Sequence, residues 1–217
     1  MELTVAAHPL LELGAFVARF ARPLAQLATP HEIVQLVEPA AVAPLVSSDT
    51  VRTEVRNLLR HGGFRPSGRS KPAAEYLHAA HQEGRFPRIN AAVDACNVAS
   101  LWSGLPISLV DADKLQHPLT VRVLPMGTSY VFNPSGQVID AGGLLALCDA
   151  EGPTGTPVKD AQRTKTDDAT THALAIVWGT RALPGRTQKA TAWYRELVQT
   201  IAGAMIEDVR VVAQPTS

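Results

Sequence analysis

Short apolar runs separated by turn residues predict a series of β-strands along this chain. Residues 3–7 and 15–20 are apolar, and His8-Pro9 lies between them, which is typical of two strands. The second half of the chain alternates in the same way between short apolar runs and turn residues such as Asn133-Pro134-Ser135-Gly136. Further strands are expected at residues 107–110, 119–124, 129–132, 144–148, 172–178 and 209–212.

Longer segments with apolar residues three and four positions apart predict helices. Residues 50–60 place Val51, Val55, Leu58 and Leu59 on one stripe, and Ser48 or Asp49 supplies a cap. Similar patterns predict helices at residues 30–37, at 70–82 with Ser70 as its cap, at 91–102 with Asn90 as its cap, and at 187–205.

Helices mainly in the first half and strands mainly in the second favour an α+β fold rather than alternating βαβ units. We expect one domain over residues 1–217, with a mixed β-sheet and helices packed on it. Residues 151–171 are polar and rich in Gly, Pro and Thr, and they are expected to form one long loop, a common place for functional residues.

Composition narrows the class of protein. Hydrophobic residues make up 46% and charged residues 18% of 217 residues, which suits a folded domain with a sizeable core. The two cysteines are too few for a disulfide scaffold and suit a reducing cytoplasm. The first twenty residues lack a basic signal-peptide start, and every apolar run stops well short of ~18 residues. A cytoplasmic protein without a membrane span is therefore expected.

One segment is strongly basic although the formal net charge of the chain is zero. Residues 51–71 contain six basic side chains against the single acid Glu54, a local charge of +5. Such clustering is the electrostatic footprint of phosphate contact, and a solvated helix face with a polar loop explains it equally well. The basic residues are Arg52, Arg56, Arg60, Arg65, Arg69 and Lys71.

The predicted helix 91–102 is almost wholly apolar or small, which is typical of a buried helix. Asn90, Asp94 and Asn97 share one of its faces. An unpaired buried polar group costs about 1–3 kcal/mol, so these side chains either face a cavity or are bonded to the protein. In the second case Asp94 caps a neighbouring loop or pairs with an arginine.

The expected loop 151–171 gathers a second set of chemically active side chains. It carries Lys159, Asp160, Gln162, Arg163, Lys165, Thr166 and Asp168, and Asp149 and His172 bound it. This density suits a loop that covers a site, although a plain solvated loop would look similar. His78 and His81 have no third ligand nearby in the sequence, so no metal is expected, and Cys96 is expected to be a core residue.

Several of these residues together resemble a known family. The segments are Arg60, Arg65-Pro66-Ser67, Ser70, residues 86–101, residues 104–107, residues 111–113, Arg122, residues 155–160 and Arg163. Their order resembles the B-three/B-four editing module of the bacterial phenylalanyl-tRNA synthetase beta subunit, which also occurs as stand-alone proteins. The resemblance covers roughly residues 51–178.

This resemblance implies a trans-acting aminoacyl-tRNA deacylase that hydrolyses the ester of a mischarged tRNA. The expected cargo is a non-cognate or non-protein amino acid, such as tyrosine or canavanine. A Gly-Glu pair in the synthetase pattern is Gly127-Thr128 here, which leaves tyrosine specificity open. Two alternatives remain: a non-catalytic tRNA- or RNA-binding module, and an amino-acid-binding protein that uses the same pocket.

The chemistry needs no protein nucleophile, cofactor or metal, because an aminoacyl ester is already activated and needs an oriented water. The expected catalytic residues are Asp94, Asn97, Asp160 and His172. The expected substrate contacts are Asn90, Asp149, Lys159 and Arg163, and a carboxylate such as Asp94, Asp149 or Asp160 would pair with a guanidino-like cargo. The expected tRNA contacts are Arg60, Arg65, Arg69 and Lys71. The sequence leaves the oligomeric state open.

Overall fold

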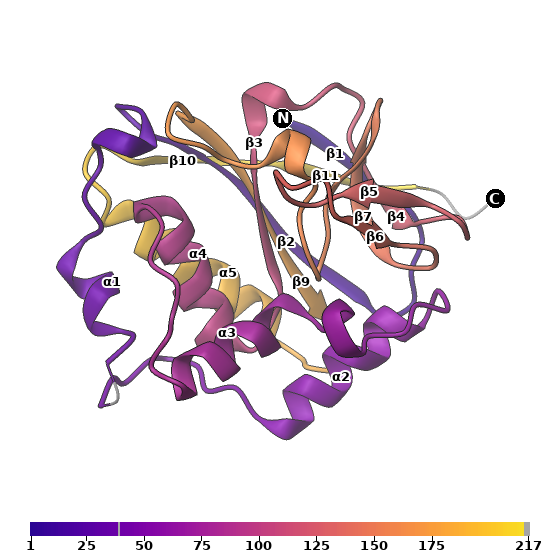
Figure 1. Ribbon diagram of the computed structural model, residues 1–217, viewed down its shortest axis with the longest axis horizontal. Helices are drawn as coiled ribbons and strands as arrows, with labels where there is room; N and C mark the ends of the chain where they lie inside the picture. Colours follow the sequence, from indigo (N-terminus) through magenta and orange to yellow (C-terminus); the bar gives the residue numbers. More distant parts are fainter. Residues whose placement is uncertain (39, 215–217) are drawn as a thin grey trace.

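Two long antiparallel strands form the centre of the molecule (Figure 1). In the computed structural model, which describes residues 1–38 and 40–214, β2 (Leu11–Arg19) and β9 (His172–Thr180) pair along their whole length. On either side, β10 (Met205–Asp208) joins β2 and β3 (Ile107–Asp111) joins β9, again antiparallel. The order of this four-stranded sheet is β10-β2-β9-β3. Almost every residue of β9 is buried, which explains its unbroken apolar sequence.

A second sheet has five strands in the order β11-β1-β4-β7-β8. It contains β1 (Glu2–Val5), β4 (Thr120–Val123), β7 (Leu145–Asp149), β8 (Gly152–Gly155) and β11 (Arg210–Ala213). β1 pairs in parallel with both β4 and β11, and the other pairs are antiparallel. A separate hairpin of β5 (Ser129–Val131) and β6 (Val138–Asp140) lies beside this sheet (Figure 1).

The helices gather on one side of the four-stranded sheet (Figure 1). α4 (Ala91–Ser103) packs on β3 and α5 (Arg186–Gln199) packs on β2 and β9, while α1 (His31–Gln35) and α3 (Ala73–Gln82) lie against α4. α2 (Asp49–Arg60) runs along the edge next to α3 and contacts β9. Four short 3-10 turns complete the elements: η1 (Leu24–Gln26), η2 (Gly68–Ser70), η3 (Ala112–Lys114) and η4 (Gln162–Thr164).

Two glycines let α5 approach the sheet closely. A Cβ atom on Gly14 would collide with the Thr191 side chain, and one on Gly179 would collide with Thr187. Thr187 and Thr191 are one turn apart on α5, so both side chains pack directly against the strand backbone at these glycines. This close contact lets Phe16, Trp178 and Tyr194 become fully buried in the core.

The structure confirms the α+β fold and the helices at α2 and α4, including the caps from Ser48 and Asn90. It corrects four expectations. Ser70 lies in η2, and α3 begins after Pro72. The last helix ends at Gln199, and Met205 already belongs to β10. The expected loop 151–171 contains β8 and η4, and the expected single sheet is two sheets and a hairpin.

Within the residues that the structure describes, no helix combines the length and the apolar character needed to cross a membrane. The same part of the chain contains no group of three or more His, Cys, Asp or Glu side chains arranged to hold a metal ion.

Candidate functional site

Asp94 and Asn90 hold the start of α4 in place. Asp94 is 2% exposed, and its carboxylate accepts hydrogen bonds from the Ile89 backbone N–H at 2.8 Å and the Thr29 hydroxyl at 2.9 Å. The Arg88 guanidinium donates a third at 3.1 Å. The Asn90 side chain caps the helix by accepting from the Val93 N–H at 3.0 Å. The contacts of Asp94 are therefore those of a loop cap and an arginine pair, one of the two readings that the sequence left open.

Asn97 differs from Asp94 although both lie on α4. It is partly exposed, and the described part of the chain supplies no hydrogen-bond partner for its side-chain amide. Its donor and acceptor groups are therefore free for a ligand.

The Asp160 carboxylate lies between the two sheets and the loop that follows β8. One oxygen accepts from the Thr156 N–H at 3.0 Å and the other from the Leu109 N–H at 3.2 Å. Desolvation by burial raises the pKa of Asp160, although the nearby Ser108 hydroxyl and the Thr156 and Leu109 N–H groups oppose that shift. A raised pKa is common in carboxyl groups that act as general bases, so Asp160 has the electrostatic setting of such a group.

A buried polar network surrounds Asp160. The Trp178 indole donates to the Ser108 hydroxyl at 2.9 Å, and that hydroxyl donates to the Thr156 carbonyl at 3.1 Å. On the helix side, burial and then the Asp160 charge raise the pKa of Cys96 to about 12. Cys96 is thus a protonated core thiol at neutral pH and unsuited to nucleophilic attack.

Two lysines and two aromatic rings lie on the other side of Asp160. The Lys159 ammonium is 4.0 Å from the centroid of the Phe132 ring and 5.9 Å from that of Tyr76. The Lys165 ammonium donates to the Phe132 carbonyl. The sequence identified the two lysines as part of a polar loop but gave no sign of the aromatic partners, because Phe132 lies in a predicted strand and Tyr76 in a predicted helix, where aromatic residues are ordinary.

Asp149 and Arg163 form a two-pronged ion pair at the end of β7. The Arg163 Nη1 is 2.9 Å from one carboxylate oxygen, Nη2 contacts the other, and the Asp149 side chain is fully buried. Burial alone would raise the pKa of Asp149, but the hydrogen bonds from Arg163 and from backbone N–H groups outweigh it and lower the pKa. The pair joins the β7–β8 turn to η4.

His172 lies at the start of β9 between a carboxylate and a guanidinium. Its Nδ1 is 2.9 Å from Asp113 and its Nε2 is 2.6 Å from an Arg19 N–H. Because an arginine can only donate, Nε2 is the acceptor and the Nδ1 proton points to Asp113. Both nitrogens of His172 are therefore engaged within the protein.

The four expected catalytic residues are thus distributed over separate groups. Among the described residues, no hydrogen bond or ion pair joins Asp94, Asp160 and His172 to one another. Of the expected catalytic residues, Asp160 is linked to the basic segment through its neighbour Lys159. Lys159 lies near Arg69, whose positive charge lowers the pKa of Lys159.

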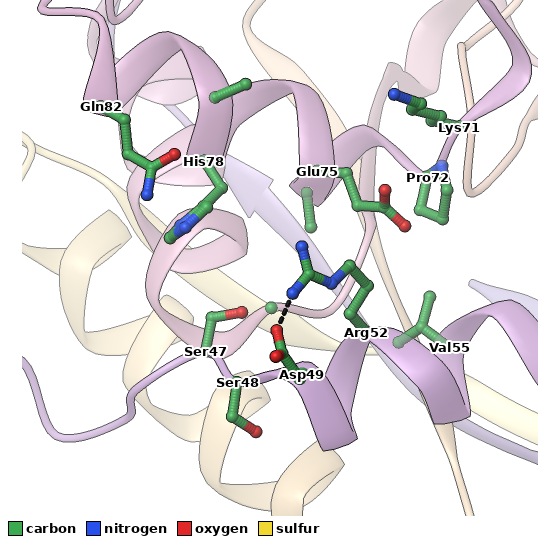
Figure 2. Close-up of a pocket in the computed structure, with 13 residues that line it drawn as sticks. Ser47, Ser48, Asp49, Arg52, Val55, Lys71, Pro72, Glu75, His78 and Gln82 are labelled. Carbon is green, nitrogen blue, oxygen red and sulfur yellow. Dashed lines mark ion pairs between the residues drawn. The ribbon is translucent and has the colours of Figure 1, made fainter. Parts of the chain in front are cut away.

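Within the basic segment, two arginines are neutralised and four basic side chains are not. Arg52 pairs with Asp49 on α2 (Figure 2), and Arg56 makes two hydrogen bonds, at 2.7 and 2.6 Å, to Glu75 on α3. Among the described residues no carboxylate lies within ion-pair distance of the remaining four, which are Arg60, Arg65, Arg69 and Lys71. These four are the expected tRNA contacts.

Two hollows accompany this segment. A groove of about 270 Å³ runs between α2 and α3, and Figure 2 shows Arg52, Glu75 and His78 among the side chains that line it. A second hollow, of about 420 Å³, is lined by residues 60 and 63–67. Gly62 brings this loop against the five-stranded sheet, because a Cβ atom there would collide with Gly143 and Val123.

Comparison with known proteins places the chain in a family. A model of the B3/4 domain matches residues 68–191, more than half of the chain. No curated protein matches. A crystal structure of an N-terminal fragment of the phenylalanyl-tRNA synthetase beta-subunit from Pyrococcus horikoshii is similar, with a TM-score of 0.53 at 12% identity. That match covers 98% of this chain and 52% of the fragment, so the chain spans about half of it, and the likeness is one of fold. The extent of the family match shows that the chain belongs to the B3/4 domain family.

Proposed function

We propose that this protein is a trans-acting aminoacyl-tRNA deacylase that acts on a mischarged tRNA. The observation that carries the proposal is the placement of Asp160. It is a desolvated carboxyl group that directly follows Lys159, and Arg69, one of the four basic side chains without a carboxylate partner, lies near enough to lower the pKa of Lys159. Membership of the B3/4 family and likeness to a fragment of a tRNA synthetase subunit support a tRNA-related role.

In the proposed reaction, water attacks the ester carbonyl that links the amino acid to the terminal ribose. The bond between the carbonyl carbon and the ribose oxygen breaks, the ribose oxygen takes a proton, and the products are a free amino acid and an uncharged tRNA. Asp160 orients the water and accepts its proton, which its raised pKa favours. Asn97 binds the substrate through its free amide, and Lys159 contacts the substrate beside Asp160.

Most of the other expected site residues have a structural role in this proposal, because they hold backbone segments of the site in place. Asp94 and Asn90 fix the start of α4 and so position Asn97. Asp149 and Arg163 fix the β7–β8 turn. His172 is engaged by Asp113 and Arg19, so a direct role would require it to leave these partners. Arg60, Arg65, Arg69 and Lys71 contact tRNA phosphates, and the local patch compensates for the zero net charge.

The cargo follows from which carboxylates are free. Asp94 and Asp149 are each held by an arginine, so Asp160 is the one of the three candidate carboxylates without an ion pair among the described residues, and its charge attracts a guanidino-like side chain beside the water that it orients. An amino acid with a guanidino-like side chain, such as canavanine, therefore fits better than tyrosine.

A second candidate function is tRNA binding without catalysis. The observation that favours it is that both Asp160 oxygens already accept backbone hydrogen bonds, as in a purely structural carboxylate.

One experiment separates these functions. The protein is incubated with tRNAs charged with a panel of non-cognate and non-protein amino acids, and release of the amino acid is followed over time. Faster release than in buffer supports the deacylase. Salt-dependent tRNA binding without release supports the binding module, and binding of a free amino acid that tRNA does not affect supports an amino-acid-binding protein.

A further inference from the structure

The backbone around Lys159 is fixed before any ligand arrives. The Thr156 hydroxyl donates to the Lys159 carbonyl at 2.8 Å and accepts from the Lys159 N–H at 3.1 Å. The Tyr130 hydroxyl also donates to that carbonyl. The Pro157 carbonyl accepts from the Ala73 N–H at 2.9 Å, which ties this loop to α3. The backbone of Lys159 is therefore held in one conformation by hydrogen bonds, as in a preorganised binding residue.

Lys159 and Lys165 converge on Phe132 from two directions. Lys159 lies over the ring, and Lys165 donates one of its three N–H groups to the Phe132 carbonyl. The Lys159 ammonium has no oxygen acceptor among the described residues, so its three N–H groups and two of Lys165 are free. A stationary pair of ammonium groups with free donors matches an oxyanion with several oxygens.

The positive charges around Lys159 outnumber the negative charges near them. Burial lowers the pKa of Lys159, and the charges of Arg69 and Lys165 lower it further. Burial also lowers the pKa of Lys165, and Asp160 opposes this shift. Of the other nearby acids, Glu75 is bound to Arg56 and Asp167 to Lys114. Three cations thus face one carboxylate, and a bound anion would relieve their repulsion.

The position identifies which anion fits. Lys159 directly precedes Asp160, the proposed water-binding carboxylate, so the anion lies beside the scissile ester. In an aminoacylated tRNA the nearest anion to that ester is the phosphodiester of the same terminal nucleotide. We propose that Lys159 and Lys165, held together on Phe132, form a binding site for this terminal phosphodiester. The proposal rests on the proposed function.

The test uses uncharged tRNA, so that no cargo carboxylate can account for the result. Affinity is measured for intact tRNA and for tRNA that lacks the last two nucleotides, with wild type, Lys159→Met and Lys165→Met. Methionine keeps the apolar stem and removes the charge. Lys189→Met is the matched control, because Lys189 is exposed on α5 and has no ion pair among the described residues.

We expect Lys159→Met and Lys165→Met each to bind intact tRNA about tenfold more weakly, which is typical of a lost charged hydrogen bond, and Lys189→Met to bind it like the wild type. The salt dependence should fall by about 0.7 in log–log slope, the value for one single-stranded phosphate. The truncated tRNA should bind all four proteins alike. Arg65→Ala should weaken binding of both RNAs equally, because its proposed contact lies outside the terminal nucleotides.

Equal losses on both RNAs, no loss in either lysine variant, or no measurable tRNA binding by the wild type would each overturn the site. Circular dichroism confirms that the variants fold. Hydrolysis of mischarged tRNA is measured on the same wild-type preparation. If hydrolysis is absent while the losses depend on the terminal nucleotides, the proposed function fails and the site stands. If hydrolysis is present without such losses, the opposite holds.

Discussion

Asp94 and Asp160 show how a carboxylate identified in a sequence can take two different parts in a structure. Asp94 lies in an almost wholly apolar helix and Asp160 in a polar segment, and the sequence marks both as candidates. Asp94 accepts hydrogen bonds from Arg88 and Ile89 just before its helix and from Thr29, 65 positions away. Asp160 accepts from Thr156, four positions away, and from Leu109, 51 positions away, and it lies next to Lys159, which has no ion pair among the described residues. Local pattern cannot distinguish the two, because the partners Thr29 and Leu109 are set by tertiary packing.

The first prediction concerns Asp160→Asn. If Asp160 accepts a proton from water, the variant should lose about 100-fold or more in the rate of ester hydrolysis, a typical contribution of a general base. Affinity for uncharged tRNA should stay within about twofold, because phosphate contacts supply most of it. Single-turnover hydrolysis and tRNA titration measure the two quantities.

Asp168→Asn is the control for Asp160→Asn, because Asp168 is an exposed carboxylate in the same segment. Urea unfolding shows whether Asp160→Asn still folds. A folded variant with the wild-type rate would remove Asp160 from the reaction.

His8 gives a prediction about pH and stability. Its Nδ1 accepts the Leu10 and Leu11 N–H groups at 3.2 and 3.1 Å. Burial, together with His61 and Arg181, lowers the pKa of His8 from 6.5 to about 4. The unfolded chain therefore binds this proton more readily than the folded one, so stability is complete above pH 6.5 and falls as the pH drops toward 4.

The His8→Asn variant should lose part of this pH dependence. The asparagine oxygen can replace Nδ1 as acceptor but does not titrate in this range. We expect the wild type to lose about 1 kcal/mol more per pH unit than the variant, below the single-proton limit because the ring is partly exposed. Urea unfolding at several pH values between 6.5 and 4.5 measures the difference, and parallel curves would contradict the assignment.

At the scale of elements, the sequence predicts the helices and strands whose own residues show a clear apolar periodicity or a capping side chain. α2 and α4 have apolar stripes and capping side chains, and both lie where the pattern places them. β8 consists of Gly-Pro-Thr-Gly, which has no alternation and Thr154 as its one β-branched residue, so only its pairing with β7 makes it a strand. The end of α5 has a similar cause, since Met205–Asp208 pairs with β2 instead of continuing the helix.

The contact between α5 and the sheet gives a prediction at this scale. Gly14→Ala should lower the free energy of unfolding by about 1–3 kcal/mol, as overpacking of a tight core does. The added methyl group would meet the Thr191 side chain. Thermal or urea unfolding measures the loss.

Thr191→Ala is the compensating change, because it removes the hydroxyl and methyl groups that the new Cβ would meet. The double variant should recover most of the stability lost in Gly14→Ala. If the two losses simply add, α5 does not depend on this close contact.

At the scale of the whole molecule, the sequence cannot show which basic side chains form ion pairs and which do not. The basic segment has a charge of +5 in the sequence, but Arg52 and Arg56 are neutralised by Asp49 and Glu75. Of the four unpaired basic side chains, Arg69 lies near enough to Lys159, 90 positions later in the chain, for its charge to lower the pKa of Lys159. The family resemblance is confirmed by the match over residues 68–191, while the placement of the site stays a prediction.

The most direct measurement is the rate at which an excess of the protein releases amino acids from a panel of mischarged tRNAs. The proposed function predicts that at least one member, with a guanidino-like side chain, is hydrolysed about 100-fold or more faster than in buffer. Correctly charged tRNAs should remain intact. If the protein binds tRNA but every member decays at the rate seen in buffer, the deacylase is contradicted.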